Sequence, residues 1–173
     1  MELNNYIASI PGFPKEGIIF RDITPILASP KAMRHVTRKL ADFIEDQDAN
    51  LVLAPEARGF FFGLPAAVEA DVAFAPVRKP GKLPREVIQE SYDLEYGTDT
   101  LQMHADAIKP GDRVVIVDDL LATGGTVEAI RKMAEKQGAE VVGAAFVVEL
   151  DDLHGRDRLG DMPVLSLVHY EGE

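Results

Sequence analysis

Runs of consecutive apolar residues alternate along this chain with segments in which apolar residues recur at helical spacing. The continuous apolar runs predict five strands, at 50–55, 71–79, 112–119, 139–150 and 162–170. Helical spacing predicts helices over 29–47 and 126–138, and 57–70 is expected to be a turn that leads into a helix. Buried strands separated by helices are typical of parallel sheets. The pattern therefore predicts an α/β fold with a mainly parallel central sheet flanked by helices.

Capping residues mark the ends of the predicted helices. Ser29 is expected to cap the first helix, with Pro30 at its first position. Gly138 is expected to act as the C-cap of the last helix. Residues 90–104 show strand-like alternation around Gly97, which predicts a hairpin.

Three polar loops follow predicted strands directly. They are Glu56–Gly59, Arg78–Lys82 and Asp118–Thr126. In open α/β sheets, ligands bind beyond the carboxyl ends of the strands. We therefore expect these loops to converge on one edge of the sheet and to form a binding site there.

The last of these loops belongs to the stretch VVIVDDLLATGGT, Val114–Thr126, which combines carboxylates with a glycine turn. Asp118 and Asp119 end a buried strand, where carboxylates are costly unless something pairs with them. The following ATGGT segment offers free N–H groups at a helix start, and its glycines permit close approach. Amides suit a phosphate and carboxylates suit a vicinal diol, so the stretch suits a ribose 5-phosphate. A capped strand-to-helix turn is the purely structural alternative.

Composition narrows the class of protein. A chain of 173 residues has the length of one domain, and no Ser/Gly linker divides it. The net charge of −11 argues against nucleic-acid binding, which needs a basic face. The absence of cysteine excludes disulfides and thiolate metal sites. The longest apolar stretch, 59–68, is too short to span a bilayer and the first residues lack a secretory pattern. We therefore expect a cytoplasmic protein without a membrane partner.

Several motifs resemble one known family. VVIVDDLLATGGT is similar to the phosphoribosyl pyrophosphate signature of the type I phosphoribosyltransferases. FRDITPIL, EARGFFFG, KPGKLPRE, YDLEYGTDTLQMH and ELDDLHGRDRL resemble, in the same order, segments of the adenine phosphoribosyltransferases. The resemblance covers nearly the whole chain. Pro55, before EARG, stands where the family more often has glycine, which bears on the stiffness of that turn.

The resemblance implies a fold and a reaction. The fold would be that of the type I phosphoribosyltransferases, a single domain over 1–173, in which residues 1–28 contribute to a base-binding hood. Residues 79–104 would form a mobile hairpin lid that keeps water from the reacting sugar. The reaction would join adenine to phosphoribosyl pyrophosphate and yield AMP and pyrophosphate. A homodimer and Mg²⁺, held mainly by substrate and water, are implied as well.

The resemblance also assigns residues to the two anionic ends of the substrate. Phosphoribosyl pyrophosphate and AMP would be bound by Asp118, Asp119, Ala122, Thr123, Gly124, Gly125 and Thr126. Pyrophosphate would be bound by Glu56, Ala57, Arg58, Arg78, Lys79, Lys82 and Tyr96. The family carries a cis peptide that falls between Glu56 and Ala57. A solvated basic loop is the alternative for the cluster at 78–82, and a packing aromatic is the alternative for Tyr96.

Catalysis and base recognition come from further positions. Arg58 would stabilise the leaving pyrophosphate, and Glu95 would accept the proton of adenine N9 as a general base. The resemblance places adenine against Ile19, Phe20, Arg21 and Leu150. A short buried strand is the alternative for the segment GIIF.

Two other functions remain open on the sequence. The same fold and mechanism serve xanthine, hypoxanthine or orotate when the base contacts differ. A non-catalytic sensor of purines or phosphoribosyl pyrophosphate would need a DNA-binding module or a basic face. The length of 173 residues and the charge of −11 supply neither.

Overall fold

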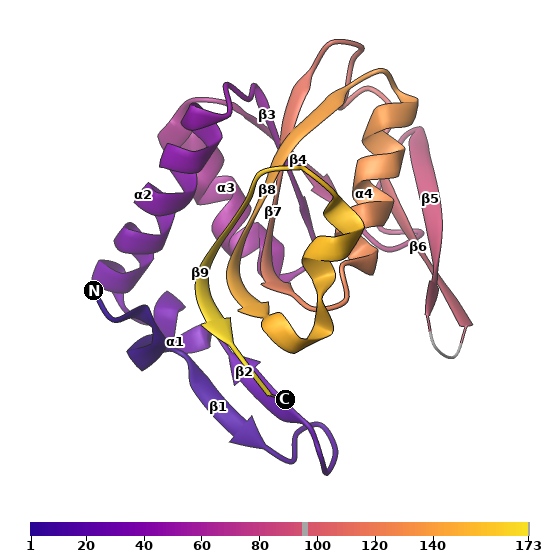
Figure 1. Cartoon of the computed structure of the whole chain (residues 1–173). Coiled ribbons are helices and arrows are strands. Elements are labelled where there is room, and N and C mark those ends of the chain that lie inside the picture. The colour runs from indigo at the N-terminus through magenta and orange to yellow at the C-terminus, as the bar shows by residue number, and fades with distance from the viewer. Residues whose placement is uncertain (95–96, 173) are drawn as a thin grey trace.

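A parallel sheet of five strands forms the centre of the computed structural model, which describes residues 1–94 and 97–172 (Figure 1). The strands lie in the order β4-β3-β7-β8-β9. Their bounds are β3 Leu51–Pro55, β4 Ala73–Val77, β7 Arg113–Leu121, β8 Glu140–Leu150 and β9 Val164–Tyr170. The predicted α/β fold with a mainly parallel sheet is confirmed, and every described pairing within this sheet is parallel.

The strands match the apolar runs, with two changes at their ends. β4 is shorter than the predicted 71–79, because Asp71 caps the preceding helix in a left-handed conformation. Arg78 leaves the parallel sheet and bridges to Gln102 instead. β7 extends two residues past Asp119 to Leu121, so the acidic pair lies within the strand, near its C-terminal end, rather than in a loop.

Helices cover both faces of the sheet (Figure 1). They are α1 Thr24–Leu27, α2 Pro30–Asp46, α3 Arg58–Ala70 and α4 Gly125–Lys136, with short 3₁₀ turns η1 Leu3–Tyr6, η2 Asp151–Leu153 and η3 Gly155–Leu159. Ser29 caps α2 as predicted, because its Oγ accepts a hydrogen bond from Ala32 N at 3.2 Å. Gly138 follows the cap residue Gln137 instead of being the cap itself, and its φ of 84° ends the helix.

The two faces of the sheet bury separate hydrophobic clusters, because successive side chains of a strand point to opposite faces. Helices α2 and α3 pack on one face, where Val36, Leu40 and Phe62 are fully buried with Val52. Helix α4 packs on the other face, and the apolar residues expected to point inward, Val127, Ile130 and Met133, are all buried there. The sheet is thereby fixed from both sides, and its carboxyl edge is held in place.

Two antiparallel hairpins extend from this core. The first joins β1 Ala8–Pro11 to β2 Ile19–Asp22 and lies next to the C-terminal end of β9 (Figure 1). The second joins β5 Val87–Leu94 to β6 Gly97–His104 and packs beside α4. It begins earlier than the predicted 90–104. Leu101 and Met103 of β6 are buried in the core, so the base of this hairpin is anchored. The predicted mobility of 79–104 stays a prediction.

None of the described helices is long and apolar enough to cross a membrane.

Candidate active site

Two adjoining cavities lie at the carboxyl edge of the sheet, where the three loops were expected to converge. The first has a volume of about 210 Å³ and is lined by Arg58, Phe146 and residues 118–127. The second, of about 180 Å³, is lined by residues 55–58, Lys79, Tyr92, Leu101, Asp118, Asp119 and Thr126. Both are lined by Arg58, Asp118, Asp119 and Thr126, so they form one continuous site with two ends. The predicted convergence is confirmed.

The acidic pair at the end of β7 occupies the junction of these cavities. Asp119 is buried, and its Oδ2 accepts a hydrogen bond from Arg58 Nε at 2.6 Å. No cation among the described residues is hydrogen-bonded to Asp118, whose Oδ1 accepts from Asp119 N at 2.8 Å. Desolvation by burial, together with the neighbouring charge of Asp119, raises the pKa of Asp118 well above its usual range. A hydrogen-bonding or cationic ligand would therefore stabilise the ionised form of Asp118.

The neighbouring helix start provides the anion-binding end. Helix α4 begins at Gly125, and no described side chain caps it. Its N-cap, Gly124, has a φ of 89°, and a Cβ there would lie 2.8 Å from the carbonyl oxygen of Gly155. Only glycine fits both constraints. Residues 122–126 all line the first cavity, so an uncapped helix N-terminus with its positive dipole faces this space.

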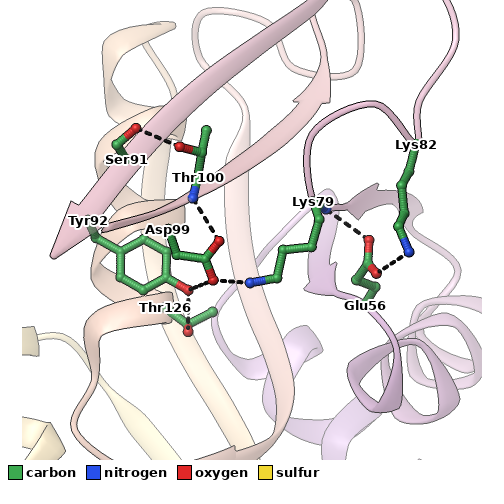
Figure 2. A network of polar contacts seen from close by, with 8 residues as sticks. All are labelled: Glu56, Lys79, Lys82, Ser91, Tyr92, Asp99, Thr100 and Thr126. Carbon is green, nitrogen blue, oxygen red and sulfur yellow. Dashed lines mark hydrogen bonds and ion pairs between the residues drawn. The ribbon is translucent and has the colours of Figure 1, made fainter. Parts of the chain in front are cut away.

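The other end is built around Glu56. Its Oε1 accepts a hydrogen bond from Lys79 N at 2.8 Å, and its Oε2 lies 3.3 Å from Lys82 Nζ (Figure 2). Oε1 also accepts from Arg78 Nε at 3.1 Å. Burial favours the neutral acid, but these donors outweigh it and lower the pKa of Glu56. The peptide bond between Glu56 and Ala57 is cis, as the resemblance implied. The predicted cationic cluster is therefore brought together, around a carboxylate of the chain itself.

Tyr92 and Asp99 were not assigned to this site from the sequence. Tyr92 lines the second cavity, and its hydroxyl lies 3.3 Å from Thr126 Oγ1. Asp99 forms an ion pair with the Lys79 ammonium (Figure 2). The two are directly opposite one another on β5 and β6. Alternation along the predicted hairpin places them on one face, but sequence spacing alone does not show which face meets the site. Glu95 and Tyr96 lie outside the described residues.

The predicted adenine-binding residues lie on the hood side of this site. Phe20 of β2 reaches it, because Arg58 Cζ is 5.9 Å from the centroid of its ring. Arg21 Cζ lies 4.0 Å from the centroid of the Tyr170 ring, and Tyr170 pairs with Leu150 across β8 and β9. Ile19, Phe20, Arg21 and Leu150 are all described, and none of them lines either cavity. Their contact with a base stays a prediction.

Comparison with known proteins shows which family this chain belongs to. Residues 22–168 match the phosphoribosyl transferase domain family. A curated adenine phosphoribosyltransferase of Streptococcus uberis is 56% identical over 172 residues, which cover 99% of this chain and 100% of the relative. The chain belongs to the adenine phosphoribosyltransferase family.

Solved structures of the family share this fold closely. The adenine phosphoribosyltransferase of Thermoanaerobacter pseudethanolicus superposes with a TM-score of 0.93 at 50% identity, covering 98% of each chain. That of Saccharomyces cerevisiae, in complex with adenine and an imino-altritol bisphosphate, has a TM-score of 0.90 at 38% identity and covers 96% of each chain. The type I phosphoribosyltransferase fold predicted from the motifs is thereby confirmed.

The two cavities contain oxygen donors for the Mg²⁺ that the resemblance implied. Mg²⁺ prefers oxygen ligands and retains several waters. Asp118 and Asp119 offer such oxygens in both cavities, and a cation would relieve the repulsion between them, so the donor set fits Mg²⁺. A second group, Glu149, Asp151 and His169, brings its ligand atoms within 4.8 Å of one another. Glu149 is already paired, since it accepts from Arg156 Nε at 2.9 Å and Ser166 Oγ at 2.7 Å.

The raised pKa of Asp118 predicts a change in stability with pH. The folded state binds this proton more tightly than the unfolded state, so the wild type loses stability as the pH rises from about 3.8 through the raised value. Asn does not titrate and retains an oxygen acceptor for Asp119 N. Asp118→Asn should therefore gain melting temperature relative to the wild type between pH 4 and pH 7.5, by at least about 2 °C.

Asp112→Asn is the matched control for that measurement. Asp112 is also buried, but hydrogen bonds from Asn50 and Lys109 N overcome the effect of burial and lower its pKa. The stability that ionised Asp112 contributes is lost only as the pH falls through about 3.8 and below, so Asp112→Asn should not gain melting temperature relative to the wild type as the pH rises from 4 to 7.5. A melting-temperature difference for Asp118→Asn that is the same at both pH values would contradict the assignment.

Proposed function

We propose that this chain transfers the 5-phosphoribosyl group of phosphoribosyl pyrophosphate to N9 of adenine, with AMP and pyrophosphate as products. The observation that supports it most directly is the order of groups along the site. An uncapped helix start, an acidic pair and a cationic loop follow one another across two joined cavities. This order matches a substrate with a phosphate at one end, a diol in the middle and a pyrophosphate at the other end.

The 5′-phosphate and the ribose are held by the loop after β7. Backbone N–H groups of residues 122–126 receive the phosphate, helped by the dipole of α4 and the Thr123 and Thr126 hydroxyls. The carboxylates of Asp118 and Asp119 accept hydrogen bonds from the ribose hydroxyls. A hydroxyl donated to Asp118 satisfies a carboxylate that burial otherwise disfavours. The sugar is thereby fixed with its C1 toward the second cavity.

Pyrophosphate departs toward Arg58, at the start of α3, and toward the loop that bears Arg78, Lys79 and Lys82. Charge develops on this leaving group as the sugar becomes oxocarbenium-like, so cations already in place lower the barrier. Arg58 lines both cavities and is the cation nearest to the acidic pair. Its pairing with Asp119 fixes the guanidinium at the junction where the bond to C1 breaks. When bound, Mg²⁺ supplies further charge neutralisation of the pyrophosphate.

Adenine enters from the hood side. Phe20, whose ring lies near Arg58, provides an apolar surface for the purine, with Ile19, Arg21 and Leu150 around it. The carboxylate of Glu95 accepts the N9 proton, and Tyr96 closes over the sugar or the pyrophosphate. The hairpin formed by residues 79–104 closes over the site and excludes water, which would otherwise capture the activated sugar.

A homodimer is supported by an apolar stripe on α3. Phe61, Leu64 and Val68 are 42%, 48% and 71% exposed, although they lie on one face of a helix. Large apolar side chains gathered on one helix face are typical of a protein–protein interface. The same helix begins at Arg58, so association through it would place a partner close to the active site.

We place the enzyme in the cytoplasm, in line with the sequence.

A panel of bases tests the proposed reaction. Incubation with phosphoribosyl pyrophosphate, Mg²⁺ and each of adenine, hypoxanthine, guanine, xanthine and orotate should yield a nucleotide with adenine alone, measured by chromatography. Each reaction without Mg²⁺ serves as the paired control and should be slower. Formation of nucleotide only from 6-oxopurines would refute the assigned base, and no nucleotide from any base would refute the enzyme.

Substitution of Arg58 tests its role at the leaving group. Arg58→Ala should lower kcat by about 10²-fold, the scale for loss of one preorganised donor, and should change the Kd of adenine far less. Arg38→Ala removes the same charge from an exposed pair with Glu69 on α2 and α3, and should retain wild-type kcat. Steady-state kinetics and adenine titration on both variants separate the two effects. A variant that loses adenine affinity while kcat is preserved would assign Arg58 to base binding.

A further inference from the structure

One pair of side chains on the second hairpin contacts both anion-binding ends of the site (Figure 2). Tyr92 of β5 and Asp99 of β6 are directly opposite one another, and the Tyr92 hydroxyl donates to Asp99 Oδ2 at 3.3 Å. Asp99 pairs with the ammonium group of Lys79 on the pyrophosphate loop. The Tyr92 hydroxyl also lies 3.3 Å from Thr126 Oγ1 in the 5′-phosphate loop. A continuous chain of polar contacts thus joins the two ends.

Each end gives up one donor to this pair. The Lys79 ammonium is a cation expected to meet pyrophosphate, and here it is neutralised by Asp99. Thr126 offers a single hydroxyl hydrogen, and the Tyr92 proton is already directed at Asp99. The contact between Tyr92 and Thr126 is therefore made by the Thr126 hydrogen. The same hydrogen is the one that a 5′-phosphate would need.

Asp99 is an anion at neutral pH. The hydrogen bond from Lys79 lowers the pKa of the Asp99 carboxyl group most, and hydrogen bonds from Thr100 N and the Tyr92 hydroxyl lower it further. Together they outweigh the effect of partial burial, which raises it. Thr100 N donates to Asp99 Oδ1 at 2.9 Å and leaves Oδ2 directed at Lys79 and Tyr92. The carboxylate therefore presents to Lys79 the same kind of charged oxygen that a phosphate would present.

The hairpin holds this pair in place. Ser91 Oγ and Thr100 Oγ1 are 2.8 Å apart next to it, and Glu90 pairs with Lys136 of α4 at 2.6 Å. Leu101, two residues after Asp99, is buried in the core and lines the second cavity. Asp99 and Tyr92 are thus presented to the site by an anchored segment.

We propose that Asp99 and Tyr92 are positioning residues that occupy one donor of each phosphate site in the free enzyme, and that the phosphates of the substrate displace them. Asp99 acts through Lys79 and Tyr92 acts through Thr126. Because the site must first release its internal partner, the apparent affinity for each phosphate group is lower than the exposed donors alone would give. The inference rests on the proposed function of the site.

The consequence is that removing the internal partner strengthens binding. Asp99→Asn keeps the shape but removes the charge that competes for Lys79. Tyr92→Phe keeps the ring and frees the Thr126 hydroxyl. A residue with a merely structural role would leave affinity unchanged or weaken it, so a gain in affinity distinguishes the two explanations.

Calorimetric titration of the whole protein in Mg²⁺ buffer tests the Asp99 arm, with pyrophosphate as the probe. Asp106→Asn is the matched control, since Asp106 pairs with Arg85 at 2.7 Å and the substitution adds the same charge on an exposed pair. Asp99→Asn should bind pyrophosphate about threefold or more tightly than Asp106→Asn, the scale of a partly exposed ion pair. Asp99→Glu retains the charge and should restore the wild-type Kd.

The Tyr92 arm uses ribose 5-phosphate as the probe. Tyr6→Phe makes the same substitution in η1, outside the lining of both cavities, and is the matched control. Tyr92→Phe should bind ribose 5-phosphate about twofold or more tightly than Tyr6→Phe. Equal or weaker binding of its probe by either variant, compared with its control, would overturn the role assigned to that residue.

Binding measurements on the wild type distinguish a failure of the proposed function from a failure of the roles proposed for Asp99 and Tyr92. If the wild type binds neither pyrophosphate nor ribose 5-phosphate, the proposed function falls and this inference falls with it. If the wild type binds both and forms AMP while Asp99→Asn and Tyr92→Phe match their controls, only the inference is wrong.

Discussion

Two adjacent carboxylates lie at the end of β7, the central strand of the sheet, where the surrounding core makes their charge unfavourable. Arg58 offsets the charge of Asp119 through a hydrogen bond of 2.6 Å, whereas Asp118 is hydrogen-bonded to no cation in the part of the chain that the structure describes. The fold places this pair where two cavities join, so any ligand that relieves Asp118 is positioned between the helix start and the cationic loop. The other residues that line the two cavities lie on either side of this pair.

The same principle extends to the cations of an acidic protein. With a net charge of −11, the chain surrounds its few site cations with carboxylates. Glu56 pairs with the side chains of Arg78 and Lys82 and accepts from the backbone N–H of Lys79, whose ammonium group pairs with Asp99. Such pairing orders the site cations without burying free charge. A polyanionic substrate then exchanges partners with groups that are already oriented.

Much of this arrangement follows from local sequence. The strands are predicted because their residues are apolar on both faces. A helix start at residue 126, one position after the observed Gly125, is predicted because a glycine turn follows a strand. The acidic pair is recognisable because carboxylates rarely end a buried strand unless something binds them. These features depend on neighbours in the chain, which a sequence displays directly.

Other features depend on contacts between distant segments. Glu56 and Lys82 are 26 positions apart, and Tyr92 and Thr126 are 34 apart, so neither pairing is visible as a motif. Which face of the second hairpin meets the site is decided by the packing of Leu101 and Met103 in the core. The contact of Phe20 with Arg58 likewise requires the hood to lie over the sheet edge. Such pairings emerge only once the tertiary packing is known.

A crystal structure of the protein soaked with AMP tests the central claim most directly. The account predicts the 5′-phosphate on the backbone N–H groups of residues 122–126 and the ribose hydroxyls within hydrogen-bonding distance of Asp118 and Asp119. A nucleotide bound elsewhere, with solvent at the start of α4 and no contact to the acidic pair, would contradict it.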